Sequence, residues 1–299
     1  MNATFTQAPN VNVPTLSSSA MLVELGISVW TARKRDKSAT SDVLTRNNAG
    51  KAAGAFNKNL MADCAELVAI QKFAANARTL HYNSTLPWND GGSRLLPTAR
   101  YIRYHAEMTG MQAEFDRLVD DFMSVYDWHA AQMHLRLGAL FNAAEYPPAA
   151  QVRNKFAFRL SYAPVPDAGD WRVNLGTEAT EILREQYGAY YADQTKRAMD
   201  DLWTRLHEEL SRFVKQLDVS EDGKKGKIFT GTIETVQNLA DMLGECNFTG
   251  DAQMRAAHER LAASLAGVTR EDLTTNEAFR ADMKRDMEAA LKALPTLDW

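Results

Sequence analysis

Residues 98–133 of the chain read TARYIRYHAEMTGMQAEFDRLVDDFMSVYDWHAAQM, and this stretch decides the fold that the sequence predicts. Its larger side chains recur at alternating steps of four and three residues, the period with which two helices pack along a seam. The seam comprises Tyr101, His105, Met108, Gln112, Phe115, Val119, Phe122, Tyr126, His129 and Met133. The pattern predicts a long helix from about residue 98 to residue 145, which Pro147 and Pro148 end.

A second long helix is predicted from about residue 177 to residue 217. Its seam comprises Trp203, Leu206, Leu210, Phe213 and Leu217. A helix of roughly 40 residues is about 60 Å long, and a short insertion joins the two. We therefore expect them to fold back as an antiparallel helical hairpin, a coiled-coil-like stalk.

The insertion, at about residues 150–176, predicts a small β-sheet at the tip of this stalk. Large apolar side chains alternate with polar ones from Arg153 to Tyr162, which is typical of a half-buried strand. Residues 171–175 are expected to return as a second strand of a β-hairpin. The segment from Val23 to Thr31 also alternates, and we expect it to be the third strand.

The rest of the chain predicts further helices and a division into segments. Residues 1–19 are rich in Pro, Ser, Thr and Asn and are expected to be a disordered lead-in. Residues 20–217 would form the strand and stalk, including a helix over about 51–80 and a loop over 83–97. Residues 228–299 would form a C-terminal helical bundle on the stalk, with helices at about 230–246, 251–266 and 276–294. The fold class predicted is therefore mainly α.

Composition and charge restrict the class of protein. The two cysteines, Cys64 and Cys246, are too few for a disulfide framework, which favours a reducing, cytoplasmic location. No stretch approaches the roughly 18 apolar residues that cross a bilayer, and the N-terminus lacks the pattern of a signal peptide. Residues 1–103 hold 12 Lys and Arg against 6 Asp and Glu, whereas the remainder holds 22 against 32. A basic first third could contact nucleic acid or an acidic partner.

The motifs of the common enzyme classes are missing from the sequence, so we expect no catalytic activity, no cofactor and no metal. Residues 50–54 lack the Gly-Lys-Ser/Thr ending of a phosphate-binding loop, and there is neither a Gly-x-Ser-x-Gly elbow nor a dinucleotide fingerprint. None of the six histidines follows a glutamate by three residues, as a di-metal helix bundle requires. Cys64 is expected in the middle of a helix as a small buried hydrophobe, and His105 and His129 as core residues of the seam.

The basic face of the predicted hairpin is the best candidate for a contact surface. It comprises Arg153, Lys155, Arg159, Trp171 and Arg172. Basic and aromatic side chains in this arrangement can dock an acidic protein surface, face solvent, or clamp a nucleic-acid backbone while stacking bases. We rank contact with a protein first, solvent second and nucleic acid third.

Three segments carry a resemblance to a known family. They are Leu22–Lys34 (LVELGISVWTARK), Arg153–Phe158 (RNKFAF) and Phe229–Asp251, in which FTGTIETV is followed by Leu239, Leu243 and NFTGD. With these motifs the chain, from about residue 20 to residue 294, resembles the bacterial and phage domain-of-unknown-function family 3150. The resemblance implies genes encoded beside a MoxR/cobalt-chelatase-like AAA+ ATPase, and it carries over no catalytic residue.

The leading hypothesis is therefore a non-enzymatic accessory or adaptor protein that works with such an AAA+ ATPase in bacteria or phage. One alternative is a nucleic-acid-binding protein of phage DNA metabolism, which the basic first third and the basic hairpin would serve. Another is a structural or scaffold protein, which would self-associate into a homo-oligomer.

Overall fold

A computed structural model describes residues 16–89, 91–166, 177–219, 225–247 and 250–295. The chain is mainly helical and divides into two units. We call residues 24–82 and 103–161 the central unit, and residues 1–23, 83–102 and 162–299 the C-terminal unit. No helix among the described residues combines the length and the apolar character needed to cross a membrane.

The elements of the described residues run in the following order. The helices are α1 (Leu16–Ser19), α2 (Lys37–Arg46), α3 (Ala65–Ser84), α4 (Tyr101–Leu137), α5 (Ala149–Arg153), α6 (Thr177–Leu217), α7 (Thr230–Glu245), α8 (Ala252–Leu265), α9 (Arg270–Thr275) and α10 (Glu277–Lys292). The 3-10 turns are η1 (Thr98–Arg100), η2 (Gly138–Leu140) and η3 (Ala143–Glu145). The strands are β1 (Ala20–Ser28), β2 (Arg33–Arg35), β3 (Asn57–Asn59), β4 (Leu86–Pro87), β5 (Arg94–Pro97) and β6 (Ala157–Pro164).

Two small sheets are formed within the described residues. Strands β4, β5, β1 and β6 lie side by side in that order, and β1 pairs with β5 in antiparallel register from Ala20 opposite Pro97 to Val23 opposite Arg94. Strands β2 and β3 form a separate antiparallel ribbon. The expectation that the Val23–Thr31 segment joins the Arg153–Tyr162 segment in one sheet is confirmed, because β1 lies beside β6. The predicted return strand at residues 171–175 lies outside the described residues.

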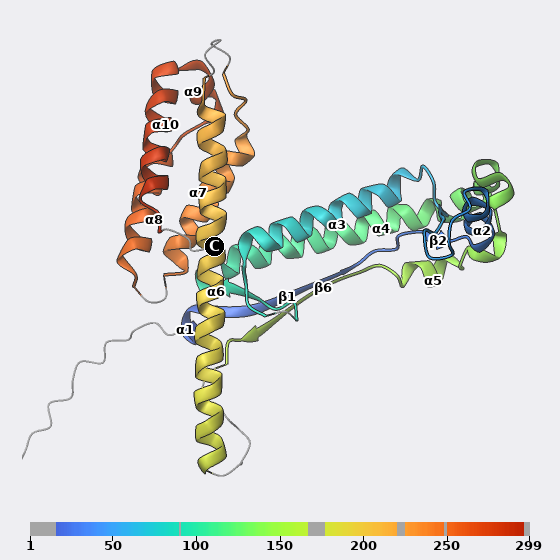
Figure 1. Ribbon diagram of the computed structural model, residues 1–299, viewed down its shortest axis with the longest axis horizontal. Helices are drawn as coiled ribbons and strands as arrows, with labels where there is room; N and C mark the ends of the chain where they lie inside the picture. The colour runs from blue at the N-terminus through green and yellow to red at the C-terminus, as the bar shows by residue number, and fades with distance from the viewer. Residues whose placement is uncertain (1–15, 90, 167–176, 220–224, 248–249, 296–299) are drawn as a thin grey trace, which may run out of the picture. The chain divides into compact units, whose positions relative to one another are not determined.

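The core of the C-terminal unit forms around α6. Its side chains at Ala198, Leu202, Leu206, Leu210, Phe213 and Leu217 are all buried and follow one face of the helix. Helices α7 and α10 pack on α6, as Figure 1 shows. The predicted bundle of C-terminal helices is therefore present, and the side chains of Asp251 and Asn276 cap α8 and α10 as the sequence predicts.

The central unit contains an antiparallel pair of helices, but its members differ from the predicted ones. Helix α3 runs beside α4, because His81 contacts Tyr104 near one end and Asp63, just before α3, pairs with Arg136 at the other (Figure 1). The predicted partner of α4 was the 177–217 helix, which is α6 and belongs to the C-terminal unit. The predicted hairpin of these two long helices is therefore wrong in its pairing.

Aromatic side chains from the strands cover the apolar stripe of α4. The rings of Phe158 and Phe115 lie 5.7 Å apart, and those of Phe156 and Phe122 lie 5.6 Å apart. Trp30, just after β1, contacts Phe122 and Tyr126. Six residues of the predicted stripe are buried, namely Met108, Phe115, Val119, Phe122, Tyr126 and Met133. His105, which was expected in the core, is exposed, and so is Gln112. Residues in or next to β6 and just after β1 cover part of the buried face.

A buried lysine organises one end of the central unit. Lys58, the middle residue of β3, is only 4% exposed. Its Nζ lies 2.9 Å from Asp36 Oδ2, 2.7 Å from Glu145 Oε2 and 2.7 Å from the carbonyl oxygen of Leu140. Burial alone would lower the pKa of Lys58, but the two carboxylates overcome this effect and raise it. The pKa of Asp36 is lowered because its carboxylate accepts the Ala39 N–H and pairs with Lys58.

The helix predicted over 51–80 begins only at Ala65, because residues 57–59 form β3 and pair with β2. Good helix formers such as Ala52 and Ala53 favoured a helix locally. Burial of the Lys58 side chain between Asp36 and Glu145 instead favours the extended conformation. Tertiary contacts thus outweigh local helix propensity in this segment.

Replacing Lys58 with methionine would leave two partly buried carboxylates without their cation. We expect Lys58→Met to lower the free energy of unfolding by about 3–5 kcal/mol, measured by urea denaturation. Lys72→Met is the matched control, because Lys72 is exposed on α3 and its loss should change stability by no more than about 0.5 kcal/mol. Equal stability of the two variants would show that the ion pairs of Lys58 do not hold this end of the unit.

Candidate functional site

The structure separates the residues of the predicted basic face. Arg153 is the last residue of α5, and its guanidinium pairs with Asp120 of α4. Lys155 is exposed between α5 and β6, and Arg159 is exposed on β6. Trp171 and Arg172 lie outside the described residues. The three described residues thus lie along α5 and β6, and one of them, Arg153, already forms an ion pair. Whether they contact a partner stays a prediction.

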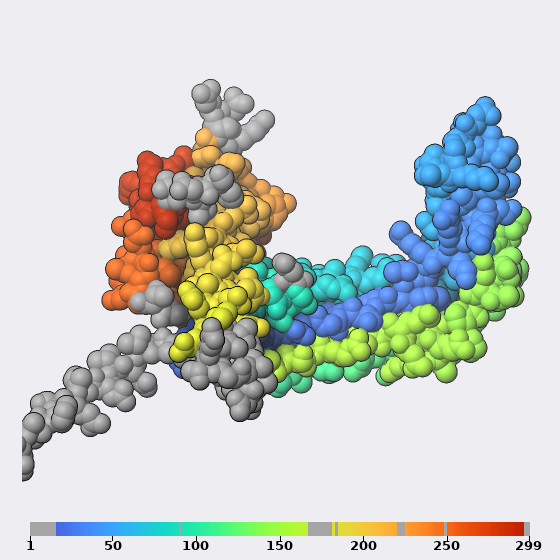
Figure 2. Space-filling view, turned by 60° about the horizontal axis from the view of Figure 1, so that its bottom comes forward, coloured from blue at the N-terminus to red at the C-terminus, as the bar shows by residue number. Residues whose placement is uncertain are grey.

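A groove lies on the central unit between β1 and α3. Its volume is about 660 Å³. The strand side is lined by Ile27, Ser28, Val29, Thr31, Arg33, Asn59 and Met61, and the helix side by Leu67, Val68, Gln71, Ala74 and Arg78. In Figure 2 the blue atoms of β1 and the cyan atoms of α3 occupy adjacent rows. Sequence reasoning missed this groove, because it arises only when β1 and α3 are placed side by side.

The strand side of the groove includes the backbone edge of β1. The register of β1 with β5 ends at Val23, whereas β1 continues to Ser28. On the α3 side, Arg78 Nη2 donates to the carbonyl oxygen of Ile27 over 2.9 Å. Because the N–H and C=O of one residue point to the same side of a strand, the backbone groups of Ile27 are directed toward α3. An additional strand that pairs with this edge would replace Arg78 as the partner of the Ile27 carbonyl.

The groove carries two positive charges, and Val68 is the exposed aliphatic side chain on its helix side. Leu67 and Ala74 are buried, and Val68 is 43% exposed although it is aliphatic. Arg33 and Arg78 are the ionisable residues of the lining. Among the described residues, no carboxylate oxygen lies within 4.0 Å of the guanidinium of either arginine. The groove thus combines a strand edge, one exposed aliphatic side chain and two positive charges.

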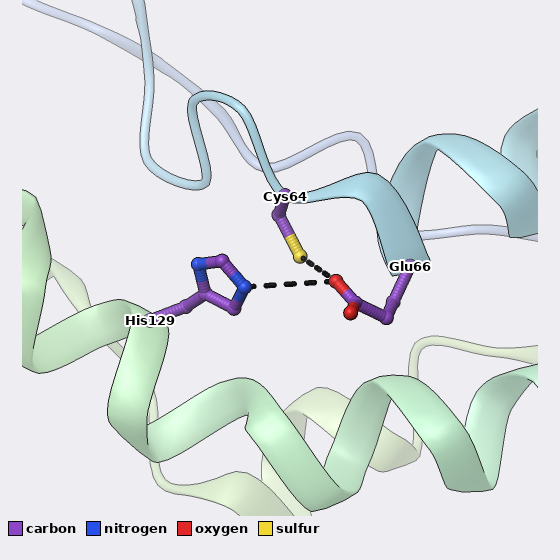
Figure 3. Close-up of side chains that lie close together, drawn as sticks. All are labelled: Cys64, Glu66 and His129. Carbon is purple, nitrogen blue, oxygen red and sulfur yellow. Dashed lines mark hydrogen bonds and ion pairs between the residues drawn. The ribbon is translucent and has the colours of Figure 1, made fainter.

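A cysteine, a glutamate and a histidine meet near the start of α3, close to one end of this groove (Figure 3). Cys64 directly precedes α3, Glu66 is the second residue of the helix, and His129 comes from α4. Glu66 Oε2 lies 3.4 Å from Cys64 Sγ and 3.6 Å from His129 Nε2. Their ligand atoms all lie within 4.8 Å of one another. We call these three residues the Cys-Glu-His cluster.

The pKa values in this cluster argue against a thiol nucleophile. Burial raises the pKa of Cys64 to about 11, and the neighbouring Glu66 carboxylate adds to the rise. The pKa of Glu66 is lowered, first by its own backbone N–H and then by the Cys64 thiol and His129. Reactive cysteines have the opposite environment, in which a positive group lowers the pKa of the thiol. The thiol of Cys64 is therefore protonated at neutral pH and donates to Glu66.

The positions predicted for Cys64 and His129 are partly confirmed. Cys64 is buried as predicted, but it precedes the helix instead of lying in its middle. The side chain of His129 is 17% exposed, so it lies at the margin of the core that was predicted for it. The cluster could be found only from the register of α3 against α4, because 65 positions of sequence separate Cys64 from His129.

No protein-family model matches this chain, and comparisons with curated proteins and with solved structures also give no match.

Proposed function

We propose that the protein is a non-enzymatic accessory protein that binds an extended, acidic segment of a partner protein in the groove between β1 and α3. The observation that carries this proposal is the backbone edge of β1 facing α3, with Val68 exposed on the helix side and with Arg33 and Arg78 in the lining. Strand addition to an exposed sheet edge is a common mode of peptide recognition. In that mode main-chain hydrogen bonds supply affinity, and pockets for alternate side chains supply specificity.

The dimensions of the groove suit a short strand. The strand side runs from Ile27 near the end of β1 to Thr31 beyond it, and four steps of extended chain span roughly 13 Å at about 3.3 Å per residue. A partner segment of four or five residues would cover it. Every second side chain of that segment would face Val68 and its neighbours on α3, and a carboxylate would meet Arg33 or Arg78.

The lining favours a peptide over a nucleic acid. Single-stranded nucleic acid is held by aromatic side chains on which the bases stack. None of the residues that line this groove is aromatic, whereas Val68 offers an exposed aliphatic surface. The lining therefore supports protein recognition, and binding of nucleic acid would require a different surface of the chain.

For the partner we propose a MoxR/chelatase-like AAA+ ATPase of a bacterium or phage. This part of the proposal rests on the family resemblance of segments such as Leu22–Lys34, and not on the groove. That segment includes Ile27, Val29 and Arg33 of the groove lining. Binding in the groove and the identity of the partner can be tested separately, since the groove can bind an acidic segment whichever protein carries it.

Negative charge placed on α3 should weaken binding of an acidic peptide. The probe is a seven-residue peptide in which glutamate alternates with valine, and its binding to the full chain is measured by fluorescence anisotropy. Val68→Glu combined with Gln71→Glu should weaken binding at least tenfold, because each new carboxylate repels the peptide. Both positions are exposed, so the fold should persist.

The matched control is Ala75→Glu combined with Asn76→Asp. It adds the same two charges to exposed positions of α3 outside the groove, so it should leave the affinity within about twofold of wild type. A peptide with lysine in place of glutamate should bind at least tenfold more weakly than the acidic one. Equal loss in the two double variants, or equal binding of the two peptides, would contradict recognition in the groove.

The ATPase is tested by affinity purification of the tagged full-length protein from its native host, with a non-hydrolysable ATP analogue present. We expect an AAA+ ATPase in stoichiometric amount with the wild type and with the Ala75→Glu, Asn76→Asp control. The Val68→Glu, Gln71→Glu variant should recover less than about a tenth as much, in line with its weaker binding. Absence of the ATPase would reject this partner, and equal recovery by both variants would place the contact elsewhere.

A further inference from the structure

We propose that the Cys-Glu-His cluster binds one zinc ion through Cys64 Sγ, a carboxylate oxygen of Glu66 and His129 Nε2, with water in the fourth position. This site is independent of the partner proposed above. It is also one that the sequence did not predict, since Cys64 and His129 were expected to be core residues.

The spacing of the three ligand atoms supports a tetrahedral ion. Zinc lies about 2.0–2.3 Å from nitrogen, oxygen and sulfur ligands, so two ligands of a tetrahedral ion are roughly 3.3–3.7 Å apart. The separations of Glu66 Oε2 from Cys64 Sγ and from His129 Nε2, 3.4 and 3.6 Å, already fall in that range. The remaining separation is no more than 4.8 Å and would close with a small rotation of the imidazole or thiol.

The chemistry of the donor set selects zinc among the common metals. A thiolate and an imidazole are poor ligands for magnesium and calcium, which prefer oxygen, whereas zinc accepts sulfur, nitrogen and oxygen together. The Cys64 side chain is fully buried, while the side chains of His129 and Glu66 are 17% and 35% exposed. Solvent therefore reaches the cluster from the side of Glu66 and His129, where the ion would enter and keep a water molecule.

Binding would replace the present contacts within the cluster. The Cys64 thiol now donates to Glu66, and Glu66 faces His129. On binding, the thiol proton leaves to solvent, the sulfur coordinates as thiolate, and the imidazole coordinates in its neutral form. The ion would join the start of α3 to α4. Since Leu67 and Val68 follow the cluster directly, it would also fix one end of the groove wall.

The test is equilibration of the full chain with zinc, removal of free metal by gel filtration, and measurement of bound zinc by mass spectrometry. We expect one zinc ion per chain and, in separate samples that contain free zinc at a hundred times Kd, a rise in Tm, because this concentration shifts the unfolding equilibrium by about 100-fold. Cys64→Ser, Glu66→Gln and His129→Gln should each lower zinc affinity at least tenfold. His134→Gln and Cys246→Ser remove a histidine of α4 and the other cysteine, and should retain one ion.

Cobalt provides a readout that needs no variant. Cobalt(II) in place of zinc should give the thiolate-to-metal charge-transfer absorption of a cysteine ligand. Less than about 0.1 zinc per chain after equilibration would overturn the proposal. So would cobalt binding without a thiolate band, or equal loss of zinc in His134→Gln and in His129→Gln.

Discussion

The central unit depends on the burial of one positive charge, that of Lys58. An ammonium group cannot leave water without partners that compensate for its lost hydration. Asp36, Glu145 and the carbonyl of Leu140 must therefore converge on β3, although they come from two different parts of the chain, one before β3 and one far after it. This convergence holds the β2–β3 ribbon against the segment that follows α4.

Both candidate sites include residues that closely follow Lys58 in the sequence. Asn59 and Met61 line the groove, and Cys64 begins the Cys-Glu-His cluster. Arg33, which supplies one of the groove's two positive charges, lies opposite Asn59 in the β2–β3 ribbon. The position of Lys58 thus determines where the strand side of the groove ends and where α3 can start.

The sequence predicted the elements of this fold better than their partners. Alternation of apolar and polar residues located the β1 and β6 segments, and helical periodicity located α4 and α6. This is possible because an element that buries one face carries apolar residues at the spacing of that face. Periodicity does not specify what covers the face. The stripe of α4 was therefore assigned to α6, whereas Phe156, Phe158 and Trp30 cover part of it. The segment at 51–64 was missed because its extended part depends on ion pairs distant in sequence.

The candidate sites were even harder to predict from the sequence than the packing partners of the helices and strands. Nothing in the sequence near Ile27 marks it as a strand edge, since that property depends on where β5 stops. Cys64 and His129 each fit a core position, and only the register of α3 against α4 places both beside Glu66. The predicted basic residues were visible as a pattern, but Arg153 pairs with Asp120 within the fold.

In the proposed account, α3 has two tasks. Its exposed side forms the wall of a groove that receives an acidic strand, and its first turn meets α4 at the Cys-Glu-His cluster. A rigid helix start would keep the wall at a constant distance from the edge of β1. Recognition through main-chain hydrogen bonds requires such a fixed distance, because strands pair only at a spacing of about 4.8 Å.

Strand addition along β1 is tested most directly by residue-resolved amide hydrogen exchange of the full chain, with and without the glutamate–valine peptide. The account predicts that the peptide slows exchange at Ile27, whose carbonyl faces α3, and at Val29, two residues further along, and leaves Gly26 and Ser28 unchanged. Unchanged exchange at Ile27 and Val29 with the peptide at saturation, or protection confined to the C-terminal unit, would contradict it.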